Sequence, residues 1–152
     1  MQQDRSLLNA EGVELLFEGD LPSYHLRSLR LEGKVLHDIT VTGPISLAQR
    51  FPLYRKTVGI NGPGQFFCIL DNRAGHENRF SFDDIQKLDS YLLENGITEF
   101  YGVTVTRDDA YPAIVGVARA NMEGRGLTGE LHATTRRGEA EGFILEKMRR
   151  SD

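Results

Sequence analysis

A cluster of polar residues follows a short apolar run near the middle of the chain, in "FCILDNRAGHENRFSFDD". It contains carboxylates, a histidine and a serine, which are the residue types that act as acids, bases, nucleophiles and ligands in proteins. The members are Asp71, Asn72, Arg73, His76, Glu77, Asn78, Ser81, Asp83 and Asp84. The segment could form a catalytic site, present a phosphorylatable hydroxyl group, or only form backbone turns and a helix cap.

Three enzymatic or metal-binding roles can be compared with purely structural ones, such as the formation of turns. Asp71, His76 and Ser81 are the residue types of a hydrolytic triad, but "RFSFD" lacks the glycines of a nucleophile elbow. His76 could act as a general base because imidazole titrates near neutral pH. Asp71, His76 and Glu77 could hold a metal ion, although such loop residues usually form turn hydrogen bonds. We therefore favour a non-enzymatic role, and predict no catalytic residue, metal site or cofactor.

Ser81 opens an amphipathic helix with apolar residues at helical spacing. These residues are Phe82, Ile85, Leu88 and Leu92. Serine is a favoured N-cap, and alanine in its place costs about 0.5–2 kcal/mol. As an exposed hydroxyl it is also a candidate phosphoacceptor, since a phosphate adds about −1.5 to −2 charges. The helix dipole would favour that charge, whereas Asp83 and Asp84 would oppose it.

Several strands surround this segment. Residues 13–41 predict two or three antiparallel strands, separated by a turn at residues 32–34 and followed by another at 43–44. "QFFCIL" is apolar on both faces and predicts a central strand that is covered on both sides. Further strands are predicted in "EFYGVTVT" and "TGELHATT", the second of them near a sheet edge.

Three other helices alternate with these strands. The first begins after Ser46 and is expected to be kinked, or to restart, at Pro52. The next is expected over residues 108–124. In the last helix, Glu139 and Glu141 near its start match the helix dipole. Its apolar face is formed by Ala140, Phe143, Ile144 and Met148.

Strands followed by alternating helices and strands predict a single α/β domain with a mixed sheet over residues 13–150. Residues 1–12 are polar and are expected to be a flexible N-terminus. Ligands of such sheets gather at the carboxyl ends of the strands. Residues 71–84, Arg107 and "TTRRGE" are expected at that edge. The N-terminal strands could also expose an edge through which a homodimer forms.

Composition argues against several partners and locations. The net charge is −4 and no basic cluster is present, which argues against nucleic acid binding. No apolar stretch reaches the roughly 18 residues of a membrane span, and "MQQDRSLLNAEG" lacks the apolar region of a secretory signal. The single cysteine, Cys68, lies in an apolar run and is expected to be buried and inert. These features favour a cytoplasmic location.

The order of the predicted elements, together with "FCILDNR…FSFDDIQKL", resembles the STAS (SpoIIAA-like) family of anti-sigma-factor antagonists, as a divergent bacterial member. The resemblance covers about residues 35–150 and extends to the arrangement of CRAL-TRIO lipid-binding domains. In the antagonists, a strand ends in an acid, and a serine opening the next helix is phosphorylated by a partner kinase. Asp71 matches that acid and Ser81 the phosphoacceptor, while Phe80 stands where the family has an acid.

Two functions follow from these observations. The resemblance implies a regulatory module that contacts a protein partner through the edge from Asp71 to Asp84, with phosphorylation at Ser81 as a switch. The alternative is a protein that binds a small anionic or lipid-like ligand in the strand-end cleft. Arg73, His76 and Arg107 would then hold the anionic group.

Overall fold

Six strands lie side by side in one sheet, in the order in which they occur along the chain. This computed structural model describes residues 12–107 and 126–150. The strands are β1 (Glu14–Leu21), β2 (Tyr24–Leu31), β3 (Lys34–Val41), β4 (Gly64–Asn72), β5 (Ile97–Thr106) and β6 (Thr128–Thr134). The pairs β1–β2 and β2–β3 are antiparallel, and the pairs from β3 to β6 are parallel. The predicted mixed α/β sheet, with antiparallel strands first, is confirmed, and β6 lies at an edge as expected.

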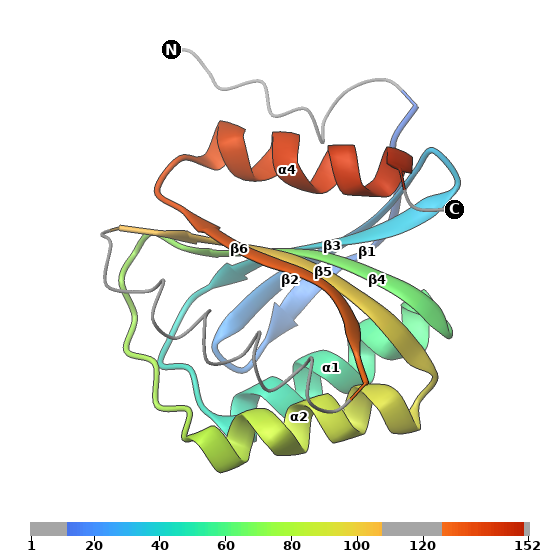
Figure 1. The fold of residues 1–152 in the computed structure, drawn as a ribbon. Coiled ribbons are helices and arrows are strands. Elements are labelled where there is room, and N and C mark those ends of the chain that lie inside the picture. Colours follow the sequence, from blue (N-terminus) through green and yellow to red (C-terminus); the bar gives the residue numbers. More distant parts are fainter. Residues whose placement is uncertain (1–11, 108–125, 151–152) are drawn as a thin grey trace.

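The described helices cover both faces of the sheet (Figure 1). They are α1 (Leu47–Asn61), α2 (Phe82–Glu94) and α4 (Arg137–Arg150). α1 and α2 lie on one face, and α4 lies alone on the other (Figure 1). None of these helices is long and apolar enough to cross a membrane.

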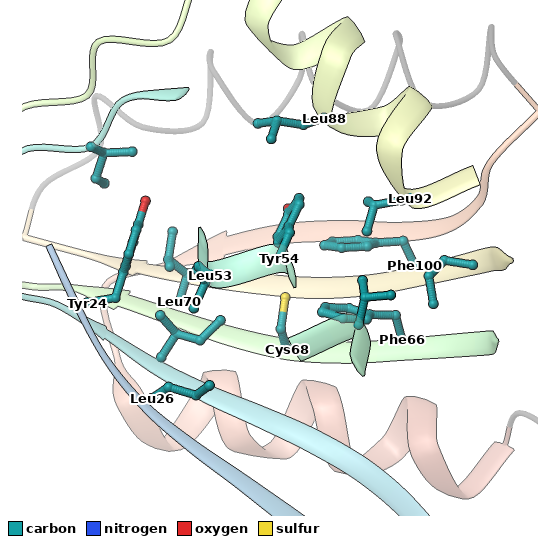
Figure 2. Packing of buried hydrophobic residues seen from close by; sticks show 14 of the residues in the cluster. Tyr24, Leu26, Leu53, Tyr54, Phe66, Cys68, Leu70, Leu88, Leu92 and Phe100 are labelled. Atoms are coloured by element: carbon teal, nitrogen blue, oxygen red, sulfur yellow. The ribbon is translucent and has the colours of Figure 1, made fainter. Parts of the chain in front are cut away.

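The middle of β4, residues 66–70, is apolar because it contributes to a hydrophobic cluster on each face of the sheet. Successive side chains of a strand point to opposite faces. Phe66, Cys68 and Leu70 therefore belong to the cluster beneath α1 and α2 (Figure 2). Phe67 and Ile69 belong to the cluster beneath α4. The prediction of a central strand covered on both sides, with a buried Cys68, is confirmed.

α2 begins and ends close to the predicted positions. Ser81 is its N-cap, and Gly96, just beyond its end, adopts the left-handed backbone conformation with φ of 86°. Asp83 and Lys87 form the ion pair expected one turn apart, at 3.3 Å. The apolar face is shorter than predicted because Phe82 is 56% exposed. The buried part of that face is formed by Ile85, Leu88 and Leu92.

Two predictions about the other helices are corrected. α1 does not restart at Pro52, which lies inside one continuous helix from Leu47 to Asn61. Tertiary packing of the turns beyond Pro52 outweighs the loss of one backbone hydrogen bond. In α4, only Glu139 lies in the first turn, where an acid matches the helix dipole, and Glu141 is instead buried and pairs with Arg137. Leu145 joins the buried face, whereas Phe143 is only half-buried.

Two predicted features fall outside the described residues. They are the flexible N-terminus, up to residue 11, and the helix expected over residues 108–124.

Candidate functional site

The loop between β4 and α2 holds most of the predicted site residues and uses several of them to fix its own backbone. The Asn72 side chain bonds to both backbone groups of His76, accepting from N–H and donating to C=O, each at 3.0 Å. The Asn78 side chain accepts the backbone N–H of Phe80 at 3.0 Å. Asn78 also forms a parallel bridge with Ile45, which follows β3. The asparagines therefore shape this loop, as side chains of their type commonly do.

Ser81 caps α2 at an exposed position. Its Oγ accepts the backbone N–H of Asp84 at 3.1 Å, and the Asp84 carboxylate accepts the backbone N–H of Ser81 at 3.0 Å. This reciprocal pair is a capping box. The hydroxyl group that the resemblance identifies as the phosphoacceptor is thus bonded to its own helix.

Two of the three residues predicted to hold an anion contact other parts of the protein. Arg73 bonds to the carboxylate of Asp71, with Nη2 at 2.8 Å from Oδ2. Arg107 covers Gly75, where an added methyl group would overlap its guanidinium. His76 is half-buried. None of Arg73, His76 and Arg107 lines the apolar cavity between the sheet and helices α1 and α2.

A buried ion cluster lies on the face of the sheet that α4 covers. Asp38 of β3 and Asp71 of β4 are both buried there, and Arg137 at the start of α4 reaches both. Arg137 Nη2 donates to Asp38 Oδ1 at 2.9 Å, and Nη1 lies 3.4 Å from Asp71 Oδ2. Its Nε donates to the buried carboxylate of Glu141 at 2.8 Å. One guanidinium therefore contacts three buried carboxylates.

Two outer arginines complete this ion cluster. Arg27 donates to Asp38 at 2.9 Å, and Arg73 makes the contact with Asp71 described above. Burial alone would lower the pKa of Arg137, but Asp38 and Glu141 outweigh burial, and the pKa is raised. Three guanidinium groups thus face three carboxylates, and we assign the cluster the role of fixing α4 to the sheet.

The sequence carries one sign of this cluster. "VLHDITV" and "FFCILDN" each place a carboxylate among residues that otherwise pack in a strand. A buried carboxylate requires a partner, so a distant arginine could have been expected from these two runs.

A second buried polar group joins β2, β3 and the end of α1. The Asn61 amide nitrogen donates to the carbonyls of Gly62 and Gln65, at 2.8 and 2.9 Å. Its oxygen therefore accepts from His37 Nε2 at 3.1 Å, and Nδ1 of His37 accepts the hydroxyl of Ser28 at 2.8 Å. The residue types match a hydrolytic triad, but Ser28 and His37 are both 0% exposed and neither lines the apolar cavity between the sheet and helices α1 and α2. This group is therefore structural.

An apolar cavity lies on the face opposite α4, between the sheet and helices α1 and α2. Its volume is about 120 Å³, well above the roughly 10–15 Å³ that one water needs. Its walls are mainly apolar, and Figure 2 shows several of these side chains pointing toward one another. They include Leu53, Leu70, Ile85, Leu88, Leu92 and Phe100.

Small residues of the central strands form the floor of this cavity. Cys68 of β4 and Gly102 of β5 are neighbours in the sheet register, and Thr104 follows on the same face. A methyl group added at Gly102 would lie 3.0 Å from the Phe100 ring and 3.3 Å from the Cys68 sulfur. Phe100 and Cys68 therefore pack closely over Gly102, and a larger residue at this position would displace them.

Arg50, which sequence reasoning missed, lines the same cavity with its guanidinium among aromatic rings. Its Nε donates to the Tyr24 hydroxyl at 3.1 Å, and Nη1 lies 3.3 Å from the Tyr54 hydroxyl. The guanidinium carbon lies 4.9 Å from the centre of the Phe80 ring. Burial raises the pKa values of Tyr54 and Cys68 to about 12, so both side chains are neutral near pH 7. The sequence signal was an arginine three and four residues before the core residues Leu53 and Tyr54.

Within residues 12–107 and 126–150, no group of three His, Cys, Asp or Glu side chains is placed to hold a metal ion. Comparisons with known proteins found no matching family model and no matching curated protein. A solved structure of MurF from Acinetobacter baumannii aligns with 93% of this chain, at a TM-score of 0.29 and 8% sequence identity. The chain spans 46% of the length of that MurF chain, and a likeness this weak carries no argument.

Replacing Arg137 with methionine should lower the free energy of unfolding by about 3–5 kcal/mol, because buried carboxylates would lose their shared cation. Arg149→Met is the matched control. The Arg149 side chain is 60% exposed and pairs with Glu32 at the surface, so its loss should cost about 1 kcal/mol or less. Urea unfolding at pH 7 measures both values. Equal costs for the two variants would contradict a stabilising ion cluster.

Stability should fall in mild acid because His37 is buried in its neutral form. Burial lowers the pKa of His37 from 6.5 to about 4, with the Asn61 hydrogen bond opposing the shift. The unfolded chain therefore takes up the proton first as the pH falls. The stabilisation that neutral His37 provides is complete above pH 6.5 and is lost as the pH falls toward 4. The total loss is on the order of 3 kcal/mol.

Urea unfolding between pH 7 and 4 tests this expectation in the wild type and in His37→Gln. The free energy of unfolding is plotted against pH for each protein. The difference between the two slopes isolates the effect of His37 from that of the carboxylates that titrate in the same range. His25→Gln is the control with the opposite sign. Hydrogen bonds to Asp20 and Glu18 raise the pKa of His25, so its contribution is lost as the pH rises. Equal slopes for the wild type and His37→Gln would contradict a buried neutral His37.

Proposed function

We propose that this protein binds a small, mainly apolar molecule in the cavity between the sheet and helices α1 and α2. The observation that carries this proposal is the cavity of about 120 Å³ with the Arg50 guanidinium in its wall. Protein interiors are close-packed, and voids larger than a water molecule are few. An unfilled apolar cavity also lowers stability. A cavity of this size therefore favours an occupant.

The lining of the cavity supports the same proposal. Small-molecule sites are typically concave and apolar, with a few polar groups that fix the orientation of the ligand. Here the apolar walls come from strands and helices, and Arg50, Asn78 and Asp89 are among the polar groups. The proposed site differs in position from the predicted strand-end cleft, because Phe80 and Asn78 contribute to it but the loop cations do not.

Filling the floor of the cavity should abolish ligand retention. Gly102→Val places a branched side chain between Phe100 and Cys68, where even one methyl group is tightly fitted. Native mass spectrometry of protein purified from its host should show a bound small molecule in the wild type and none in Gly102→Val. Gly59→Ala is the control, because a methyl group there meets no other atom within 4 Å. A clean wild-type mass, or equal retention by Gly102→Val, would count against the proposal.

We propose as a second candidate a STAS-like regulatory module that contacts a protein partner through the edge from Asp71 to Asp84. The three antiparallel strands, the alternation that follows and the serine-capped α2 support the resemblance. Phe82 supports a contact surface, because this large apolar side chain is 56% exposed beside Ser81. Large exposed aromatic side chains are enriched where proteins bind one another.

Ser81→Asp separates the effect of charge from the effect of the cap. Aspartate caps helices about as well as serine, so the variant should keep the wild-type melting temperature. If the edge is a charge-sensitive contact surface, affinity for a co-purified and identified partner should change about tenfold or more. Ser81→Asn provides a neutral cap as the control. Identical partner affinity in the wild type, Ser81→Asp and Phe82→Ser would argue against this candidate.

A further inference from the structure

We propose that the ligand is an uncharged molecule no larger than one ring, with an oxygen that accepts a hydrogen bond from the Tyr54 hydroxyl. A small cyclic ketone has this chemistry. The inference rests on the proposed ligand-binding function, and it specifies the size, the charge and the polar contact of the molecule in the same cavity.

The volume of the cavity limits the size of the ligand. It measures about 120 Å³. An engineered apolar cavity of about 150 Å³ in another protein, lined by leucine, isoleucine and phenylalanine, holds benzene. The present cavity is smaller, so a single ring is the largest body that it accommodates, and a fused ring system is excluded.

The Tyr54 hydroxyl provides the reason for an acceptor oxygen. Tyr54 lines the cavity and is only 6% exposed. A phenol can accept one hydrogen bond and still donate its own hydrogen. Tyr54 accepts from Arg50 Nη1 at 3.3 Å, but within residues 12–107 and 126–150 its O–H has no acceptor. Buried donors without an acceptor are uncommon and costly. An oxygen of the ligand would accept this hydrogen bond.

The charges around the cavity favour an uncharged ligand. Arg50 and Asp89 both line the cavity, and their opposite charges cancel. Arg50 already donates to the hydroxyls of Tyr24 and Tyr54, and Asp89 also has a partner in the protein. Burial raises the pKa of Tyr54 to about 12, so its hydroxyl keeps its proton near pH 7. A charged ligand would therefore lose its hydration without gaining a counter-charge of its own.

The rest of the wall suits a hydrocarbon ring. Four leucines from three elements line the cavity, namely Leu53, Leu70, Leu88 and Leu92. Figure 2 shows Tyr54 between the sheet and the two leucines of α2, Leu88 and Leu92. A saturated ring would contact these side chains while its oxygen meets the Tyr54 hydroxyl.

Two probes of the same shape test the acceptor by calorimetry at pH 7. They are cyclopentanone and methylenecyclopentane, which differ only in whether an oxygen or a CH₂ group is double-bonded to the ring. Tyr54→Phe removes the donor and should weaken cyclopentanone binding about threefold to tenfold, because one hydrogen bond is lost. It should leave methylenecyclopentane binding nearly unchanged. Tyr91→Phe is the matched control. Tyr91 packs edge-on against Phe51, outside this cavity, so its change should affect neither probe.

Two charged probes of similar size, butyrate and cyclopentylammonium, test the requirement for an uncharged ligand. Both should bind the wild type about tenfold or more weakly than cyclopentanone, because each would be buried without a counter-charge. Tighter binding of either charged probe would overturn this part of the inference.

The outcomes separate this inference from the proposed function. If Tyr54→Phe weakens the binding of both uncharged probes equally, or of neither, the acceptor assignment is overturned and a ligand-binding cavity remains. If no probe binds to a protein that retains a molecule in native mass spectrometry, the assigned ligand class alone is overturned. If no probe binds and the mass is clean, both proposals are contradicted.

A crystal structure of the wild type with cyclopentanone decides the matter if Tyr54→Phe does not fold. We expect the ketone oxygen about 2.8 Å from the Tyr54 hydroxyl oxygen. An ordered water molecule in its place, with no ketone in the cavity, would overturn the assignment.

Discussion

The side chain of Arg137 is the cation that three buried carboxylates share, and it holds α4 over one face of the sheet. Asp38 and Asp71 lie on neighbouring strands with side chains that are only 7% and 8% exposed. Carboxylates buried in this way need a cation, and α4 supplies it from its first residue. The helix is thereby fixed over one face, where the ion cluster is satisfied within the protein. The apolar cavity lies on the opposite face, beneath α1 and α2.

The two faces therefore differ in packing, although they share the same strands. On the α4 face, β4 presents Phe67, Ile69 and the paired Asp71. On the other face, the small side chain of Cys68 lies beside Gly102 and leaves the cavity open. Because the two sets alternate along β4, one strand provides both a closed core and the floor of a candidate site. The loop after β4 adds Phe80 and Asn78 to that site.

The features that could be predicted from the sequence depend on local patterns. The buried β4, the span of α2 and the cap at Ser81 follow from periodicity and from residues within one or two helical turns. The ion cluster could not be predicted in the same way, because Arg137 is 66 residues from Asp71 and 99 from Asp38. Arg50 likewise meets Tyr24 across 26 residues. The polar residues of the loop between β4 and α2 suggested a functional site, yet its asparagines and Ser81 bond mainly to the backbone.

A crystal structure of the full chain, purified from its host without a refolding step, is the most direct test of the proposal that this domain binds a small molecule in its core. We expect density for a bound small molecule in the cavity between the sheet and helices α1 and α2. A cavity occupied only by ordered water or by repacked side chains would contradict it. A small molecule bound only at another surface would do the same.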